Sequence, residues 1–107
     1  MPMIDIKYDD AKVKDEEIII LSRAIQEIVS GVTHIEDVFV YADSPRIKIK
    51  IAPIEVFIQM SAYKIADVDK LIQEIKLRLS EWKSKSGFPH LINLTLIPMN
   101  WKIEIGI

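Results

Sequence analysis

The sequence has few of the residues that build several common kinds of functional site. It contains no cysteine, so it holds neither a disulfide framework nor a thiolate metal site. Its three glycines are scattered and form no glycine-rich loop for nucleotide phosphates. Its two histidines, His34 and His90, stand alone and lack the spacing of a metal-binding pair, which is typical of surface or capping residues. We therefore expect no metal site and no nucleotide site.

Long apolar runs and an excess of one charge are also missing. The longest apolar runs, such as Ile18 to Leu21, fall far short of the roughly 20 residues that span a membrane. The N-terminus lacks the basic start and apolar stretch of a signal peptide, which favours a cytoplasmic protein. The 14 basic and 16 acidic residues are spread along the chain, whereas nucleic-acid binding usually needs a basic stripe. We expect neither a membrane nor a nucleic acid as a partner.

Hydrophobic residues, by contrast, are abundant. They make up 50% of the 107 residues, a length that predicts one domain spanning residues 1–107. So small a domain has too little interior to bury this much apolar surface. Burial against further copies of the chain is the simplest remedy, so the composition predicts a homo-oligomer.

Strand-like alternation begins almost at once. From Met3 to Tyr8 apolar side chains recur at every second residue, and Pro2 precedes them at a position where a strand tolerates proline. Further strands are predicted at 36–42, 54–61 and 91–99, the first of them covered on both faces. A short strand-like arm at 46–51 is separated from the next strand by Pro53, and 101–107 alternates as a C-terminal strand.

Two amphipathic helices are predicted between these strands. The first spans about 15–30, with acidic residues in its first turn and Gly31 after its end. The second spans about 67–85, with Asp67 as its N-cap. Each strand-helix-strand step is long enough for a parallel crossover, which predicts an α+β fold: two consecutive β-α-β units forming a four-stranded sheet with both helices on one face. The bare face would then pack against other subunits.

A chain that begins Met-Pro-Met-Ile, places Pro2 at the head of the first strand and repeats β-α-β within about 110 residues resembles the tautomerase superfamily. This superfamily includes 4-oxalocrotonate tautomerase, 5-carboxymethyl-2-hydroxymuconate isomerase and macrophage migration inhibitory factor. The chain is most similar to small bacterial members of two-unit length. The resemblance covers the whole chain in element order, and it implies a homotrimer with an active site at each Pro2, near a subunit boundary.

The resemblance also gives Pro2 a chemical role. If Met1 is removed, Pro2 becomes a free secondary amine, whose pKa an apolar pocket and nearby cations lower. Such an amine can take a proton from the carbon next to a ketone and return it elsewhere on a conjugated system. The implied activity is keto-enol tautomerisation of a small carboxylate-bearing substrate, with no metal and no cofactor.

Candidate substrate-binding residues follow from charge and position. Arg46 and Lys48 share one face of the arm with Lys50, and Arg46 is the best carboxylate binder because its guanidinium bonds two oxygens at once. The resemblance adds side chains that could close the site, namely Tyr63, Asn100 and Trp101, with Phe39 or Tyr41 as further possibilities. The alternatives are also plain: edge lysines prevent aggregation, and aromatic residues pack at interfaces without catalysing anything.

Two other interpretations of the whole chain stay open at this point. The order β-α-β-β-α-β is also that of ferredoxin-like domains, which serve as binding or regulatory modules, often as dimers. A tautomerase-fold oligomer without activity, acting as a binding or scaffold module, is the other. In both, Pro2 only starts a strand.

Overall fold

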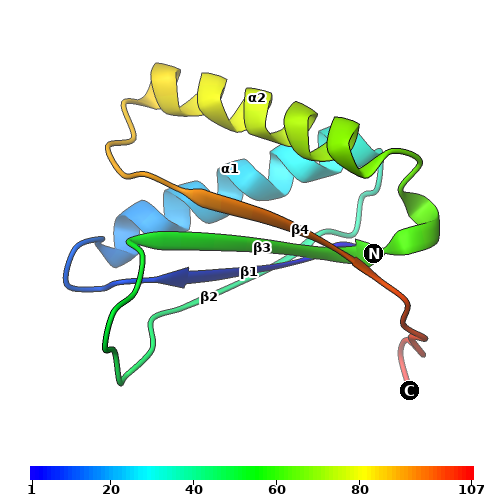
Figure 1. Ribbon diagram of the computed structural model, residues 1–107, viewed down its shortest axis with the longest axis horizontal. Helices are drawn as coiled ribbons and strands as arrows, with labels where there is room; N and C mark the ends of the chain where they lie inside the picture. Colours follow the sequence, from blue (N-terminus) through cyan, green and yellow to red (C-terminus); the bar gives the residue numbers. More distant parts are fainter.

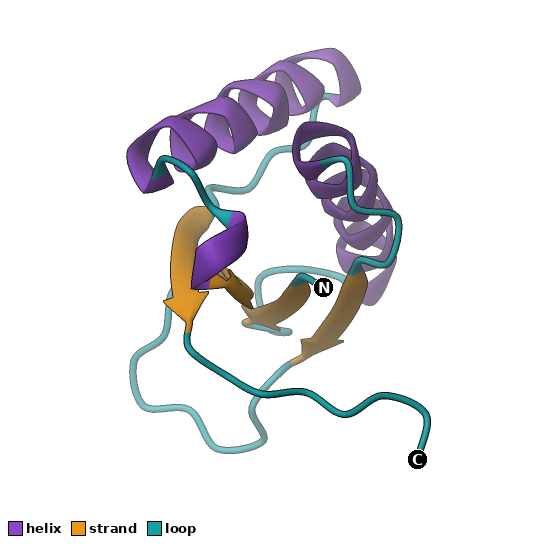
Figure 2. Cartoon of the chain, turned by 90° about the vertical axis from the view of Figure 1, so that its right-hand side faces the viewer, coloured by secondary structure: helices purple, strands orange, loops and turns teal.

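The computed structural model describes residues 1–107 and consists of one mixed four-stranded sheet with two helices above it. Figure 1 shows both helices on the same side of the sheet, and Figure 2 shows the same two layers from the side at which the chain begins. The opposite face of the sheet carries no helix and is called the uncovered face below. The elements are β1 (Met3–Tyr8), α1 (Asp15–Thr33), β2 (Phe39–Asp43), β3 (Ile54–Ser61), the 3₁₀ turn η1 (Ala62–Lys64), α2 (Val68–Ser86) and β4 (Asn93–Met99).

The sheet is built from two parallel pairs. β1 pairs with β2 and β3 pairs with β4, both in parallel, while β1 and β3 join the halves in antiparallel fashion to give the order β2-β1-β3-β4. The prediction of two consecutive β-α-β units with both helices on one face is therefore confirmed. A ferredoxin-like sheet splits each unit by inserting another strand, so this alternative is wrong for the fold.

The core lies between the sheet and the helices because both contribute apolar residues at their own periods. On β1 the side chains of Ile4 and Ile6 are fully buried, and α1 buries residues at helical spacing, including Leu21 and Ile25. α2 adds Ile75 to the same cluster. No helix of the chain is both long and apolar enough to cross a membrane.

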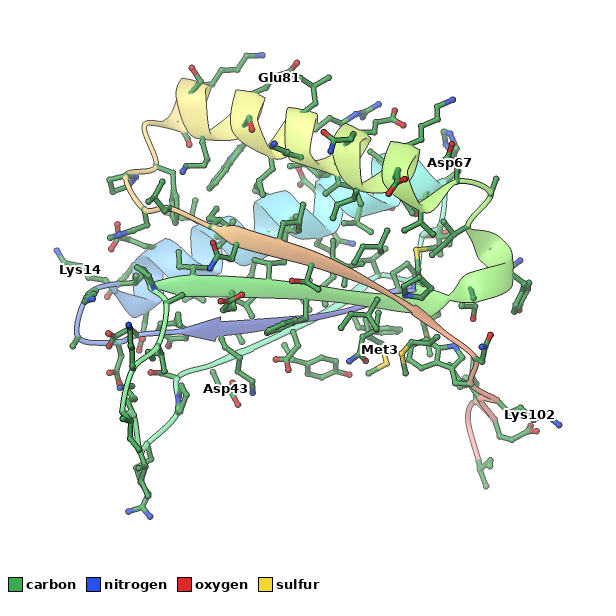
Figure 3. All side chains as sticks on the ribbon, viewed as in Figure 1. Met3, Lys14, Asp43, Asp67, Glu81 and Lys102 are labelled. Atoms are coloured by element: carbon green, nitrogen blue, oxygen red, sulfur yellow. The ribbon has the colours of Figure 1, made fainter.

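The uncovered face is divided into an apolar end and a polar end. The end near the N-terminus carries Met3, Phe39, Ile97 and Met99 around Gln59, and Phe57 borders this end in the middle of the face. At the other end, Lys7 Nζ lies 2.6 Å from Asp43 Oδ1, and Asn93 Nδ2 donates to Glu55 Oε1 at 3.0 Å. Figure 3 shows Met3 and Asp43 on this side of the sheet, away from the helices. The apolar end is thus the part of the face whose burial against another molecule would be favourable.

The helix boundaries differ from those predicted by three residues at the end of α1 and by one residue at each end of α2. α1 continues past Gly31 to Thr33, because the hydroxyl of Thr33 donates to the Val29 carbonyl at 2.7 Å and His34 then takes a left-handed conformation with φ 59°. α2 begins one residue later than expected, and its predicted cap is confirmed, since the Asp67 carboxylate accepts from the Lys70 N–H at 3.0 Å.

The predicted strands at 46–51 and 101–107 are absent from the structure, because neither segment pairs with another strand of the chain and a strand needs a partner backbone. The arm and the C-terminal segment leave the sheet at opposite ends, and both run on the side of the uncovered face (Figure 1). β2 is an edge strand, and it exposes Phe39 and Tyr41 instead of being covered on both faces.

Candidate functional site

Pro2 stands at the head of the central part of the sheet. Its side chain is fully buried, and its carbonyl accepts the Phe39 N–H at 3.1 Å, which ties the start of β1 to the start of β2. The missing N–H of a proline costs nothing there, because residue 2 precedes the first paired residue of the ladder. The register of β1 against β3, in which Met3 pairs with Gln59, places Met1 beside Ser61 when continued by two residues.

A pocket of about 190 Å³ opens beside this N-terminus. The end of β3, η1 and the C-terminal segment all contribute to it. Its lining residues are Met1, Ser61, Tyr63, Trp101, Ile103 and Ile105. The pocket joins three segments that lie far apart in the sequence, and Met1 is one of its lining residues.

One hydrogen bond closes the far wall of this pocket. The indole Nε1–H of Trp101 donates to the Ser61 hydroxyl at 2.8 Å. Ser61 is itself buried at 6% exposure, so the bond satisfies a polar group that has lost its water. Tyr63 stands at the rim with 81% of its surface exposed, and Lys64 Nζ lies 5.5 Å from the centre of its ring.

The structure brings together only some of the residues predicted for the site. Tyr63 and Trp101 share the pocket with Met1, whereas Asn100 is exposed and lies outside the lining. Arg46 and Lys48 sit in the arm that precedes β3, at the Tyr8 end of β1, which is about 20 Å of strand away from Pro2. The Lys48 ammonium pairs with the Asp10 carboxylate, while Arg46 is exposed and forms no ion pair within the chain.

The perturbed titrating groups lie at that far end as well. A hydrogen bond to Asp15 raises the pKa of Tyr8 to about 12, and a hydrogen bond to Asp43 raises the pKa of Lys7 above its ordinary range. The Lys14 backbone N–H, with a smaller effect from His90, lowers the pKa of Glu17. No cluster of three metal-binding side chains occurs in the chain. Within one chain, then, the pocket is lined by hydroxyl, aromatic and aliphatic groups.

Sequence reasoning missed Ser61 and Lys64. Ser61 could have been found, because the alternation through Phe57 and Gln59 predicts its side chain on the uncovered face at the end of the strand. Lys64 had no such signal, since η1 interrupts the strand period just before it. The sequence also gave no sign that Ile103 and Ile105 line the pocket, because the alternation of apolar residues in 101–107 predicted a strand.

No family model and no curated protein matches the sequence, but solved structures match the fold. A fused 4-OT described as a wild type symmetric trimer has a TM-score of 0.66 and 11% identity, covering 98% of this chain and 94% of its own. The macrophage migration inhibitory factor-like protein of Entamoeba histolytica has a TM-score of 0.60 and 16% identity, and the match covers 96% of this chain and 95% of that protein. A 5-carboxymethyl-2-hydroxymuconate delta-isomerase has a TM-score of 0.63 and 12% identity, and the match covers 99% of this chain and 89% of that protein.

These matches cover nearly the full length of each chain. Their sequence identities are so low that they show a shared fold and nothing more. Two parallel β-α-β units joined through an antiparallel centre, with both helices on one face, define the class as α+β. The chain shares the fold of these structures, which is the fold that the resemblance to the tautomerase superfamily implied.

Proposed function

We propose that this chain is a tautomerase-like isomerase that moves a proton between carbon and oxygen of a small keto-enol acid. The free amine of Pro2, after removal of Met1, is the general base. The observation that carries the proposal is the place of Pro2: fully buried at the head of the central strand, next to a pocket that Met1 itself lines. Without Met1 the nitrogen is a secondary amine; with it, the nitrogen is an amide and accepts no proton.

Pocket size supports a role for Met1 removal. A cavity of about 190 Å³ is smaller than the roughly 300–1,000 Å³ of typical ligand sites. Loss of the Met1 side chain widens the cavity on the side of Pro2, so one cleavage both frees the base and makes room for a substrate. The apolar lining of Trp101 and the two isoleucines then keeps the amine poorly solvated, which lowers its pKa towards neutrality.

The carboxylate of the substrate needs a cation, and we propose that a second copy supplies it. Arg46 is the candidate, because it is exposed and unpaired, whereas Lys48 is already engaged by Asp10. The arm leaves on the side of the uncovered face, whose apolar end is suited to packing against other copies. A homotrimer, as in the fused 4-OT, would bring the arm of one subunit towards the pocket of the next.

The test begins with the intact mass of untagged protein made in cells, where we expect the mass of the chain without Met1. The enol-to-keto conversion of small 2-oxo acids is then followed by absorbance. Pro2→Ala should lower the rate by about 10²-fold, the lower end of the contribution of a general base, since the alanine amine lacks the ring that fixes its position. Pro89→Ala, at an exposed proline, is the matched control and should keep full activity. A Pro2→Ala variant as active as the wild type would show that Pro2 is not the base.

One observation favours the alternative of an inactive tautomerase-fold oligomer that binds or scaffolds other molecules. No lysine or arginine side chain lines the pocket within a chain. If the purified protein retains Met1, this alternative is the better one, because Pro2 then has no basic nitrogen.

A further inference from the structure

The C-terminal segment is attached to the rest of the fold by one polar contact, which Trp101 makes. Among all backbone and side-chain hydrogen bonds, only the bond from Trp101 Nε1 to Ser61 Oγ joins residues 100–107 to the remainder of the chain. No ion pair involves the segment. Ile103 is 39% exposed, Ile105 is 75% exposed and Ile107 is fully exposed, so apolar burial decreases along the segment beyond Trp101.

This segment forms the wall that faces the N-terminus. Ile103 and Ile105 line the same pocket as Met1, and Figure 2 shows the segment running below the sheet on the uncovered side. Ser61 is the only buried polar residue of the chain, so the strand end offers a single, desolvated acceptor for the indole. A hydroxyl in such a place holds its partner more firmly than one in water does.

We propose that Ser61 is a positioning residue: through Trp101 it holds residues 101–105 as a removable wall over the Met1–Pro2 bond. Ser61 does not contact the reacting atoms. It determines the ratio of the open to the closed position of residues 101–105. The effect of the wall on substrate turnover rests on the proposed function. Its effect on access to Met1 does not.

Removal of Met1 has a defined chemistry that such a wall would control. Hydrolysis of the Met1–Pro2 peptide bond consumes one water, releases methionine as a free amino acid and leaves the Pro2 nitrogen as a secondary amine. An aminopeptidase must bind Met1 and reach the carbonyl before Pro2, whose ring is fully buried. With the wall closed, Met1 forms one side of the pocket and is only partly exposed. In the folded protein, cleavage therefore requires the wall to open.

The first test measures the wall directly by the fluorescence of Trp101. The chain has two tryptophans, so Trp82→Phe leaves Trp101 as the only one. In this background Ser61→Ala removes the hydrogen-bond acceptor and Ser61→Thr keeps it. Losing one neutral hydrogen bond should shift the open-to-closed ratio by about fivefold, which raises the quenching of Trp101 by acrylamide. Ser61→Thr should restore wild-type quenching. Thr95→Ala, at a hydroxyl of the same face outside the pocket lining, is the matched control.

The second test measures access to the N-terminus. Protein that carries Met1 is incubated with a purified methionine aminopeptidase, and the loss of methionine is followed by intact mass. Ser61→Ala and Trp101→Phe should lose Met1 about fivefold faster than the wild type, as the same shift in opening requires, and Ser61→Thr should not. Circular dichroism and thermal unfolding of each variant check that the sheet is intact. Because Trp101→Phe leaves Ser61 in place, it tests the wall even if Ser61→Ala folds poorly.

The outcomes separate the two proposals. The proposal of the wall would be overturned if Ser61→Ala showed the same quenching as the wild type and if both Ser61→Ala and Trp101→Phe lost Met1 at the wild-type rate. This holds whatever the activity of Pro2. Faster cleavage in those variants with no Pro2-dependent activity would support the wall and reject the proposed isomerase. If both hold, Ser61→Ala should raise KM for the 2-oxo acid more than it lowers kcat, because the wall shapes the bound state and leaves the base untouched.

Discussion

At the scale of single residues, Pro2 combines two requirements that are usually separate. Its ring belongs to the core, and its carbonyl fixes the start of β2. Its nitrogen, in contrast, becomes chemically useful only once the preceding residue is gone. Structural rigidity and reactivity therefore fall on the same residue, so a base at this position would be held in place by the fold itself.

Tyr8 offers a prediction that is independent of the site. Its hydroxyl donates to the Asp15 carboxylate at 2.7 Å, and this bond raises the pKa of Tyr8 from 10.0 to about 12. The folded pKa lies above the unfolded one, so the stabilising contribution is complete below pH 10 and is lost as the pH rises towards 12. Tyr8→Phe should cost about 1 kcal/mol of stability at neutral pH.

Absorbance of tyrosinate checks this directly. The wild type should show one late ionisation that is missing in Tyr8→Phe, while Tyr63→Phe serves as the control and should retain the late step. A wild-type titration without a step near pH 12 would contradict the bond between Tyr8 and Asp15.

At the scale of elements, the two helices end in the same conformation with different residues. α1 is capped at its C-terminus by His34 with φ 59°, and α2 is capped by Gly87 with φ 71°. Left-handed backbone costs a residue with a side chain roughly 1 kcal/mol more than glycine. His34→Gly should therefore raise the free energy of unfolding by up to about 1 kcal/mol, and Gly87→Ala should lower it by about as much.

Urea unfolding of both variants tests the pair of predictions. An added Cβ at Gly87 would meet no atom within 4 Å, so a loss there reports backbone strain without a steric clash. A neutral effect at both positions would show that the helix ends relax in solution.

The elements also show what could be predicted from sequence and what could not. β1 and β3 were predicted at their true bounds, because strict alternation and flanking prolines are local signals. The end of α1 was misplaced since Gly31 suggested a stop, whereas the Thr33 hydroxyl prolongs the helix. In the site, Tyr63 and Trp101 were found by type and position. That Arg46 and Lys48 lie a strand's length from Pro2 depends on β3 being antiparallel to β1, which no local pattern reveals.

At the scale of the whole molecule, the uncovered face predicts assembly. Phe57 borders its apolar end in the middle of the sheet, on β3 between β1 and β4. Phe57→Glu should break the proposed oligomer, lowering the assembly constant by about 10²-fold or more, because an unpaired charge in an apolar interface is costly. Size-exclusion chromatography with light scattering gives the mass.

Leu77→Glu is the control for this change. Leu77 is also apolar and is 60% exposed, but it lies on α2, on the other side of the molecule. It should leave the assembly intact. A wild-type protein that is monomeric at micromolar concentration would reject the assembly, and with it the proposed contribution of Arg46 from a second copy.

The position of the N-terminus at the centre of the sheet, beneath the C-terminal segment, has a consequence for protein synthesis. The ribosome makes Met1 long before Trp101, and β3, the antiparallel partner of β1, emerges about halfway between them. Until Trp101 has left the ribosome, the C-terminal segment cannot lie across the first two residues. Processing of the N-terminus thus has a time window set by translation, and a codon change that slows synthesis before Trp101 would lengthen that window without altering a single amino acid.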